Sequence, residues 1–185
     1  MSRLDDFMEL LTGEFDNTRQ LRELENEGVA DFPFARHKNT VCNDKIDNLP
    51  RGFGGVFLVE ESSYTTGSYT RNSAHLFLFT QEGEGVKLTA YEIPGDGTKT
   101  DFSYARMGRV DYAALKVADS FTPAVFTLEG DTWQGGSVSR FSPVGRFTLH
   151  ERFSAEMLEV SETMELNGRR TFGYDQPIQY RRITR

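Results

Sequence analysis

Short runs of aromatic and β-branched residues, separated by turn sequences, fill most of the chain after residue 55. Fifteen Phe and seven Tyr residues bring the aromatic fraction to 12% of the 185 residues. Such residues fit the half-buried surface of a sheet better than a helix. Runs that follow one another at such short intervals indicate antiparallel strands joined by hairpins. The sequence therefore predicts a mostly-β fold.

Two turns give the firmest predictions of local structure. Glu82-Gly83-Glu84-Gly85 separates two apolar runs, and Asn167-Gly168 is the two-residue type that hairpins favour. Residues 64–73, rich in Thr, Ser, Gly and Tyr, are expected to be a connection. The expected strands are residues 34–43, 55–61, 75–80, 86–93, 124–128, 132–140, 147–153, 157–166, 170–174 and 179–183.

Helices are expected mainly at the front of the chain. Apolar residues recur at steps of three and four over residues 4–15, and Ser2 is placed to cap this helix. A second helix is expected over residues 18–27, capped by Asp16 or Asn17 and ended by Gly28. A short helix is expected over residues 111–116.

An up-and-down order of eight to ten strands leaves two outer edges, and closure of the sheet removes both. We therefore predict one closed antiparallel β-barrel of the calycin (lipocalin-like) kind, with room for one small ligand and an N-terminal helix. An open, half-wound sheet is the alternative. The expected single domain covers residues 1–185, with a helical opening at about 3–27 and the barrel at about 34–184.

Charge and composition exclude several classes of function. With 21 Lys and Arg against 28 Asp and Glu, the net charge is −7, so overall charge favours neither nucleic acid nor an anionic membrane. No apolar run approaches the ~20 residues of a membrane span. The opening residues lack the features of a signal peptide, and Cys42 is the only cysteine, so we expect a cytoplasmic protein. No metal site is expected, because the three His residues lack the spacing of one.

Three segments resemble the CpcT/CpeT family of phycobiliprotein chromophore lyases. Residues 13–20 (Gly-Glu-Phe-Asp-Asn-Thr-Arg-Gln) resemble the family's Gly-x-Phe-x-Asn-x-x-Gln, and residues 57–61 (Phe-Leu-Val-Glu-Glu) its Leu-Tyr-x-Glu-Gln. Residues 168–173, with Tyr-Arg-Arg at 180–182, resemble the family's Gly-x-x-x-Trp-Gly and its aromatic-basic ending. The family's Pro-Tyr-Arg-Gln-Arg cluster is replaced by Tyr-Thr-Arg-Asn-Ser-Ala-His at residues 69–75.

The resemblance implies a barrel that holds an open-chain tetrapyrrole, phycocyanobilin or phycoerythrobilin, and delivers it to a cysteine of a phycobiliprotein subunit. The attacking thiol then belongs to the partner, and the barrel supplies a pocket, a conformation and a proton donor. No cofactor is built in, and the bilin is the bound ligand. Which bilin, which acceptor cysteine and whether the chain forms a homodimer stay open.

The resemblance also implies which residues hold the bilin. Glu60 is the expected catalytic residue and faces the pyrrole nitrogens, while Arg71 binds a propionate. Further ligand-binding residues are expected beside them and along the adjoining strands, with Tyr64 and Tyr69 as an aromatic lid. These further residues are Tyr64, Tyr69, His75, Tyr91, Trp133, Arg140 and Arg152.

Other interpretations compete with this one. Glu60 and Arg71 are also a plausible salt bridge at a barrel rim, and Trp133 a plug for one barrel end. At the level of function, the runner-up is a non-enzymatic carrier of another small apolar ligand, such as a lipid or a haem derivative. A barrel filled by its own aromatic side chains and acting only through a partner is the third hypothesis.

Overall fold

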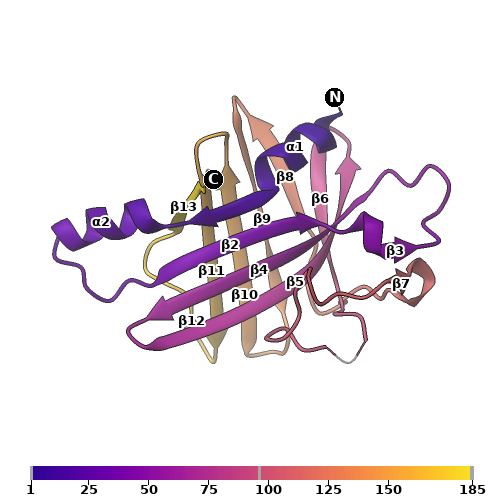
Figure 1. Cartoon of the computed structure of the whole chain (residues 1–185). Coiled ribbons are helices and arrows are strands. Elements are labelled where there is room, and N and C mark those ends of the chain that lie inside the picture. Colours follow the sequence, from indigo (N-terminus) through magenta and orange to yellow (C-terminus); the bar gives the residue numbers. More distant parts are fainter. Residues whose placement is uncertain (1, 96, 184–185) are drawn as a thin grey trace.

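Ten antiparallel strands close into one barrel in the computed structural model, which describes residues 2–95 and 97–183 (Figure 1). Met1, Asp96 and residues 184–185 of the expected domain lie outside the described residues. The barrel strands are β1 (Gly13–Asp16), β2 (Phe34–Val41), β4 (Val56–Thr66), β5 (Tyr69–Glu82), β6 (Gly85–Tyr91), β8 (Ala124–Glu129), β9 (Thr132–Arg140), β10 (Gly145–Phe153), β11 (Leu158–Leu166) and β13 (Ile178–Arg182).

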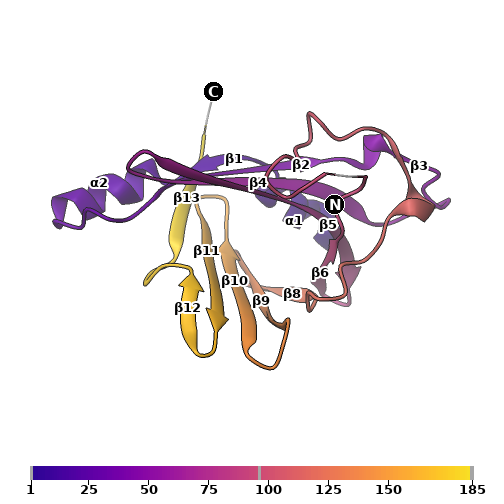
Figure 2. The same cartoon turned by 90° about the horizontal axis from the view of Figure 1, so that it is seen from below.

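The ring runs in the order β10-β9-β8-β6-β5-β4-β2-β1-β13-β11 and closes where β11 pairs with β10, from Gly145↔Leu166 to Phe153↔Leu158. Figure 2 shows β1, β2 and β4 in one wall and β8 to β11 with β13 in the wall opposite. A further strand, β12 (Arg169–Phe172), pairs with residues 164–166 of β11, on the same edge of β11 as β13. The predicted closed barrel with an N-terminal helix is confirmed.

Helix α1 (Arg3–Leu11) closes one end of the barrel (Figure 1). Ser2 caps it as predicted, in a reciprocal capping box with Asp5. Its buried Phe7 lies against the rings of four barrel residues at centroid distances of 4.8–5.4 Å; these are Phe79, Phe126, Trp133 and Phe153. The helix is shorter than expected, because residues 13–16 form β1 between β2 and β13.

Helix α2 (Thr18–Asn26) lies at the side of the barrel. Asp16 accepts a hydrogen bond from the Thr18 amide, whereas Asn17 turns away and bonds to the backbone of Pro33 and Ala35. Buried Gln20 ties the helix to β13 through the Pro177 carbonyl and the Gln179 amide, both at 2.9 Å. Gly28 follows the helix with φ +80°, a conformation that suits glycine.

The prediction for residues 64–73 is wrong. Residues 64–73 are not a connection, because β4 continues to Thr66 and β5 begins at Tyr69, in register from Val56↔Phe79 to Thr66↔Tyr69. The hairpin is therefore much longer than expected, and only Gly67 and Ser68 turn the chain. The predicted turns at 83–84 and 167–168 are confirmed, and Asn167 and Gly168 both have positive φ.

A second apolar layer covers the outer face of β4 and β5. It is centred on Phe57, Val59, Leu76 and Leu78, and the segment between β6 and β8 folds over them. Where a helix was expected over residues 111–116, this segment instead forms a short 3₁₀ turn of three residues (Tyr112–Ala114). No helix among the described residues is long and apolar enough to cross a membrane.

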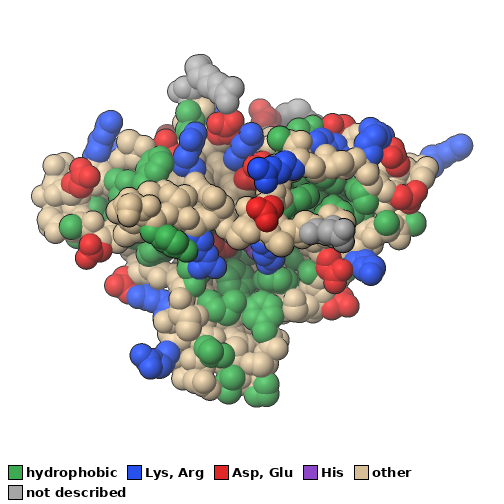
Figure 3. Space-filling view, turned by 60° about the horizontal axis from the view of Figure 1, so that its bottom comes forward, with side chains coloured by type: hydrophobic (Ala, Val, Ile, Leu, Met, Phe, Trp, Pro, Cys, Tyr) green, Lys and Arg blue, Asp and Glu red, His purple; other side chains and the backbone are tan. Residues whose placement is uncertain are grey.

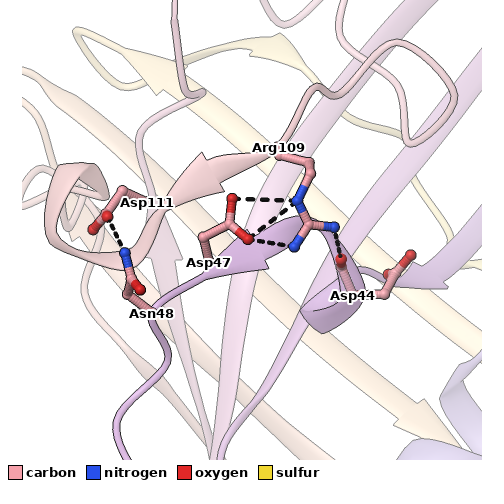
Figure 4. Close-up of polar contacts among 5 residues, drawn as sticks. All are labelled: Asp44, Asp47, Asn48, Arg109 and Asp111. Atoms are coloured by element: carbon pink, nitrogen blue, oxygen red, sulfur yellow. Dashed lines mark hydrogen bonds and ion pairs between the residues drawn. The ribbon is translucent and has the colours of Figure 1, made fainter.

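Polar contacts fasten this covering segment to the loop that follows β2. The loop contains a 3₁₀ turn (Asn43–Lys45) and β3 (Ile46–Asp47), which pairs in parallel with β7 (Val110–Asp111). Arg109 binds the Asp47 carboxylate and donates to the Asp44 carbonyl at 2.9 Å, and Asn48 bonds to Asp111 (Figure 4). The segment is thus held at a fixed place on the barrel.

Candidate functional site

The inner face of the barrel changes from apolar to polar along β4. Its inward side chains are Leu58, Glu60, Ser62 and Tyr64, in that order away from α1. The opposing inward residues of β5 change in the same way, because Glu60 pairs with His75 and Tyr64 with Arg71. One end of the barrel is therefore filled by aromatic packing, and the other end carries ionisable groups.

A cavity of about 260 Å³ occupies the polar end. It adjoins a smaller recess of about 30 Å³, which shares four lining residues with it and is also lined by Glu60 and Glu151. The residues that line the larger cavity come from β4, β5, β10, β11, β12 and the segment between β6 and β8. They are Ser62, Tyr64, Arg71, Ser73, His75, Lys99, Phe121, Phe147, Glu162, Met164, Thr171 and Phe172.

Glu60 and His37 form a buried ion pair, with 3.5 Å between Glu60 Oε2 and His37 Nε2. His37 comes from β2, the neighbour of β4, and also points inward. Burial alone would lower the pKa of His37, but the Glu60 carboxylate outweighs burial and leaves the pKa raised. Burial likewise opposes ionisation of Glu60, yet His37 keeps its pKa below the ordinary value. Each group therefore favours the charged form of the other.

Two further carboxyl groups, those of buried Glu151 and half-buried Glu162, face this pair and behave in the opposite way. Burial, reinforced by the negative charge of Glu60, raises the pKa of Glu151 to about 8 and that of Glu162 to about 7. The Tyr64 hydroxyl donates a hydrogen bond to Glu162 at 3.1 Å. Near neutral pH, Glu151 is thus expected to hold its proton, while Glu162 titrates in this range. Carboxyl groups poised in this way can donate or accept protons.

Two cationic side chains lie at the open end of the cavity. Arg71 stands over the Phe172 ring at 4.5 Å, and Lys99 over the Phe121 ring at 4.7 Å. Lys99 arrives from outside the barrel, where its backbone carbonyl accepts a bond from the Ala74 amide at 2.7 Å, beyond the end of the β5–β6 pairing. Burial lowers the pKa of Lys99. His75 stays neutral, because burial lowers its pKa to about 4.

Some buried polar atoms of this end have no hydrogen-bond partner among the described residues. His37 Nδ1 and Tyr180 Oη are two of them, and the two rings lie 5.2 Å apart. Because a buried polar atom without a partner costs free energy, such atoms cluster where a ligand or water completes the bonding. They add two unsatisfied polar groups to the ionisable cluster.

The structure brings four of the nine expected site residues together. Glu60, Tyr64, Arg71 and His75 all face the barrel interior on β4 and β5. Tyr69 lies beside them in sequence, but its side chain is 69% exposed at the turn and does not line the cavity.

The other four expected residues lie elsewhere. Tyr91 packs on the outer face against Phe57 at 5.2 Å, and Trp133 is buried at the closed end against Phe7. Arg140 and Arg152 are exposed, because the alternation of β9 and β10 turns them outward. Gly135 and Gly136 allow close approach of neighbouring strands rather than of a ligand. A Cβ on Gly136 would lie 2.2 Å from the Leu149 carbonyl oxygen.

Sequence reasoning missed His37, Lys99, Glu151 and Glu162. His37 was considered only as a metal ligand, and Lys99 lies in an irregular segment without a pattern. Glu151 and Glu162 did leave a signal, because each stands at an inward position of a strand whose other inward residues are largely apolar. A charge at such a position indicates a buried polar site.

Comparison with known proteins assigns the chain to no family. No protein-family model matches the chain, and no protein of curated function shows significant similarity to it. Among the described residues, no group of three or more His, Cys, Asp and Glu side chains is arranged to hold a metal ion. The cavity itself combines carboxyl, imidazole, phenol and cationic groups with aromatic walls.

Proposed function

We propose that the chain binds a bilin in this cavity and presents it to a cysteine of a phycobiliprotein subunit. The observation that carries the proposal is the meeting of buried acids, two cations and aromatic walls in one cavity. A bilin is flat and conjugated, and it carries pyrrole nitrogens and two propionates. Arg71 and Lys99 match the propionates, Glu60 the pyrrole nitrogens, and the rings of Phe121, Phe147 and Phe172 the flat skeleton.

The volume of the cavity supports partial rather than complete burial of such a ligand. At about 260 Å³, it lies just below the range of roughly 300–1,000 Å³ that is common for small-molecule sites. The part of the bilin that is to be transferred then stays outside the mouth, where the thiol of an acceptor can reach it. A protein that delivers its ligand needs such an arrangement.

The transfer is an addition and needs no oxidant or reductant. The acceptor sulfur forms a bond to one carbon of an exocyclic double bond of the bilin, the double bond becomes single, and its other carbon gains a proton. The thiol proton is released as the sulfur attacks, so the net change is addition of S–H across the double bond. Glu162, hydrogen-bonded to Tyr64 and with a pKa of about 7, is suited to supply the proton to carbon.

Absorption spectroscopy tests the binding step. Phycocyanobilin and phycoerythrobilin, mixed separately with the purified protein, are expected to give a red-shifted and sharpened band. Glu60→Gln should weaken binding by about one to two decades, because a charge-assisted hydrogen bond is lost. Glu61→Gln is the matched control, since Glu61 is the next residue of β4 and lies on the outer face, where it contacts the Tyr104 amide.

A second measurement tests the transfer. An apo-phycobiliprotein subunit, incubated with the loaded protein and then denatured, should retain the chromophore covalently. No spectral change with either bilin would refute the proposal as a whole. Spectral binding without a covalent product would leave a carrier instead of a lyase.

The size of the cavity favours a second candidate, a non-enzymatic carrier of a smaller apolar acid. A fatty acid of medium length has one carboxylate for Arg71 or Lys99 and an alkyl chain for the aromatic walls. Calorimetric titration with such an acid distinguishes the two. Binding of the fatty acid that a bilin cannot displace would favour the carrier.

A further inference from the structure

The hairpin turns around the cavity mouth carry exposed apolar side chains. Phe141 and Val144, in the turn between β9 and β10, are 38% and 48% exposed, and Leu166 at the end of β11 is 49% exposed. They form one patch, because Leu166 pairs with Gly145 and the Asn167 amide bonds to the Val144 carbonyl at 2.9 Å. We call Phe141, Val144 and Leu166 the apolar tip.

The apolar tip is continuous with the cavity. Phe141 lies 5.1 Å from Phe121, whose ring lines the cavity, and Phe121 lies 6.0 Å from Phe147, which also lines it. Hydrophobic side chains gather on the lower lobe of the molecule in Figure 3, with Lys and Arg side chains at its left side. Helix α1 lies at the other end of the barrel (Figure 1).

Charge is distributed unevenly along the chain. Residues 3–27, which include both helices, hold eight Asp and Glu against three Arg. By contrast, residues 132–150 hold two Arg and no acidic residue. Residues 166–172 also hold two Arg and no acidic residue. Arg146 is paired with Glu165 and Arg170 with Asp175, but Arg140 and Arg169 form no ion pair with a described residue. Although the net charge of the chain is −7, the surface beside the apolar tip is therefore basic.

We propose that the apolar tip and its arginines dock the mouth of the barrel onto an anionic lipid surface. Exposed apolar patches mark sites of protein or membrane contact. Here the apolar side chains stand on projecting turns, a shape that can enter the headgroup layer, whereas a groove would suit a peptide. Apolar insertion combined with arginines near the surface is the arrangement by which peripheral proteins hold anionic membranes.

This docking points the cavity at the membrane. A ligand leaving the cavity past Phe121 would then reach the lipid directly, so the surface suits exchange of an apolar ligand with a bilayer. The inference does not depend on the identity of the ligand, and it stands or falls separately from bilin binding. It also revises the expectation drawn from overall charge, which favoured no anionic surface.

Co-sedimentation with vesicles tests the proposal. The protein is expected to sediment with vesicles of phosphatidylglycerol and phosphatidylcholine in equal parts, and to stay in solution with pure phosphatidylcholine. Raising the salt concentration to 0.5 M should weaken binding to the anionic vesicles, because salt screens the arginines. Arg140→Gln combined with Arg169→Gln should weaken it about 30-fold. Val144→Ser combined with Leu166→Ser should weaken it about tenfold.

Matched controls separate docking from general changes of charge or hydrophobicity. Arg22→Gln with Arg51→Gln removes the same charge from other exposed places, and Val29→Ser with Val41→Ser removes similarly exposed apolar groups. Both control pairs should bind anionic vesicles as the parent does, with unchanged melting temperatures. Absence of sedimentation with anionic vesicles would overturn the proposal, and an acidic protein would then be the better candidate partner for this surface. Equal losses in the tip and control variants would overturn it as well.

Discussion

At the scale of the residue, the His37–Glu60 pair is the feature that controls the polar end of the barrel. Each group is charged only because the other lies 3.5 Å away, since burial disfavours the charge on both. Burial, reinforced by the same charge on Glu60, keeps Glu151 and Glu162 protonated to higher pH. The ion pair thus favours ionisation of Glu60, and its carboxylate adds to the burial that disfavours ionisation of Glu151 and Glu162.

Replacing Glu60 should therefore reverse the direction in which the pKa of His37 is shifted from its ordinary value. In the parent protein the His37 ring is expected to titrate above 6.5 in a nuclear magnetic resonance titration. In Glu60→Gln, burial acts without its main counter-charge, so the ring should titrate below 6.5. Because His37 can lose its proton, the free energy of unfolding should fall by only about 1–3 kcal/mol.

Glu61→Gln serves as the control for this experiment, as it changes the same charge on the outer face of β4. His37 should titrate as in the parent protein in that variant. An unchanged titration of His37 in Glu60→Gln would contradict the ion pair.

The sequence allowed part of this site to be predicted, and the reason is local. Glu60, Tyr64, Arg71 and His75 lie on two strands of one hairpin, so strand alternation alone puts them on one face. Glu151 and Glu162 lie 91 and 102 residues further along the chain than Glu60. Only the closure of the ring between β10 and β11 and the curvature of the barrel bring them opposite Glu60, and no local pattern encodes either.

At the scale of the element, α1 acts as the floor of the barrel. Phe7 is fully buried and touches four aromatic rings from β5, β8, β9 and β10. Phe7→Ala should lower the free energy of unfolding by about 3–5 kcal/mol, because it leaves a cavity among rings that cannot collapse onto it.

Urea denaturation measures the effect of Phe7→Ala, with Glu9→Ala on the exposed face of the same helix as the control. The control should leave the midpoint nearly unchanged, since Ala is a good helix former. A small loss for Phe7→Ala would show that α1 does not support the barrel.

Strand β9 depends on its glycines in a different way. A Cβ at Gly136 would lie 2.2 Å from the Leu149 backbone oxygen, so Gly136→Ala must push β9 and β10 apart. We expect a loss of about 1–3 kcal/mol in the free energy of unfolding. Gly54→Ala is the control, because nothing lies within 4 Å of its added Cβ, and it should be neutral or slightly stabilising. Similar midpoints of chemical unfolding for the two variants would refute this account.

The element that could not be predicted from the sequence is the half of the β4–β5 hairpin that lies next to its turn. Its inward residues, Ser62, Tyr64, Arg71 and Ser73, are mainly polar because they line the cavity. The alternation of apolar and polar residues that reveals a strand is therefore lost at the site itself. The apolar halves of the same strands, packed over α1 and under the covering segment, were predicted correctly.

At the scale of the whole molecule, the barrel has an apolar, closed end and an ionisable, open end. The closed end contributes packing, while the open end holds three buried ionisable groups, His37, Glu60 and Glu151, beside the half-buried Glu162. The stability of the whole chain must then depend on the protonation of the open end.

The direction of this dependence follows from the pKa shifts. In the folded protein Glu151 and Glu162 keep protons up to about pH 8 and 7, whereas in the unfolded chain they lose them near 4.5. Between these values the folded state binds more protons, so the free energy of unfolding falls as pH rises. His37, with a raised pKa, acts in the same direction above 6.5. His75 and Glu60 act in the opposite direction, but only below about 6.5 and 4.5 respectively.

From pH 6.5 to 8, Glu151, Glu162 and His37 therefore lower stability together. Urea denaturation at a series of pH values should show a fall, of which Glu151 alone accounts for about 2 kcal/mol. Glu151→Gln removes that titrating proton and should flatten the dependence, while Glu156→Gln, at an exposed turn, should reproduce the parent curve. If stability rises over this range, or if Glu151→Gln falls as steeply as the parent, then Glu151 does not hold its proton inside the barrel, and the acid–base role of the open end loses its physical basis.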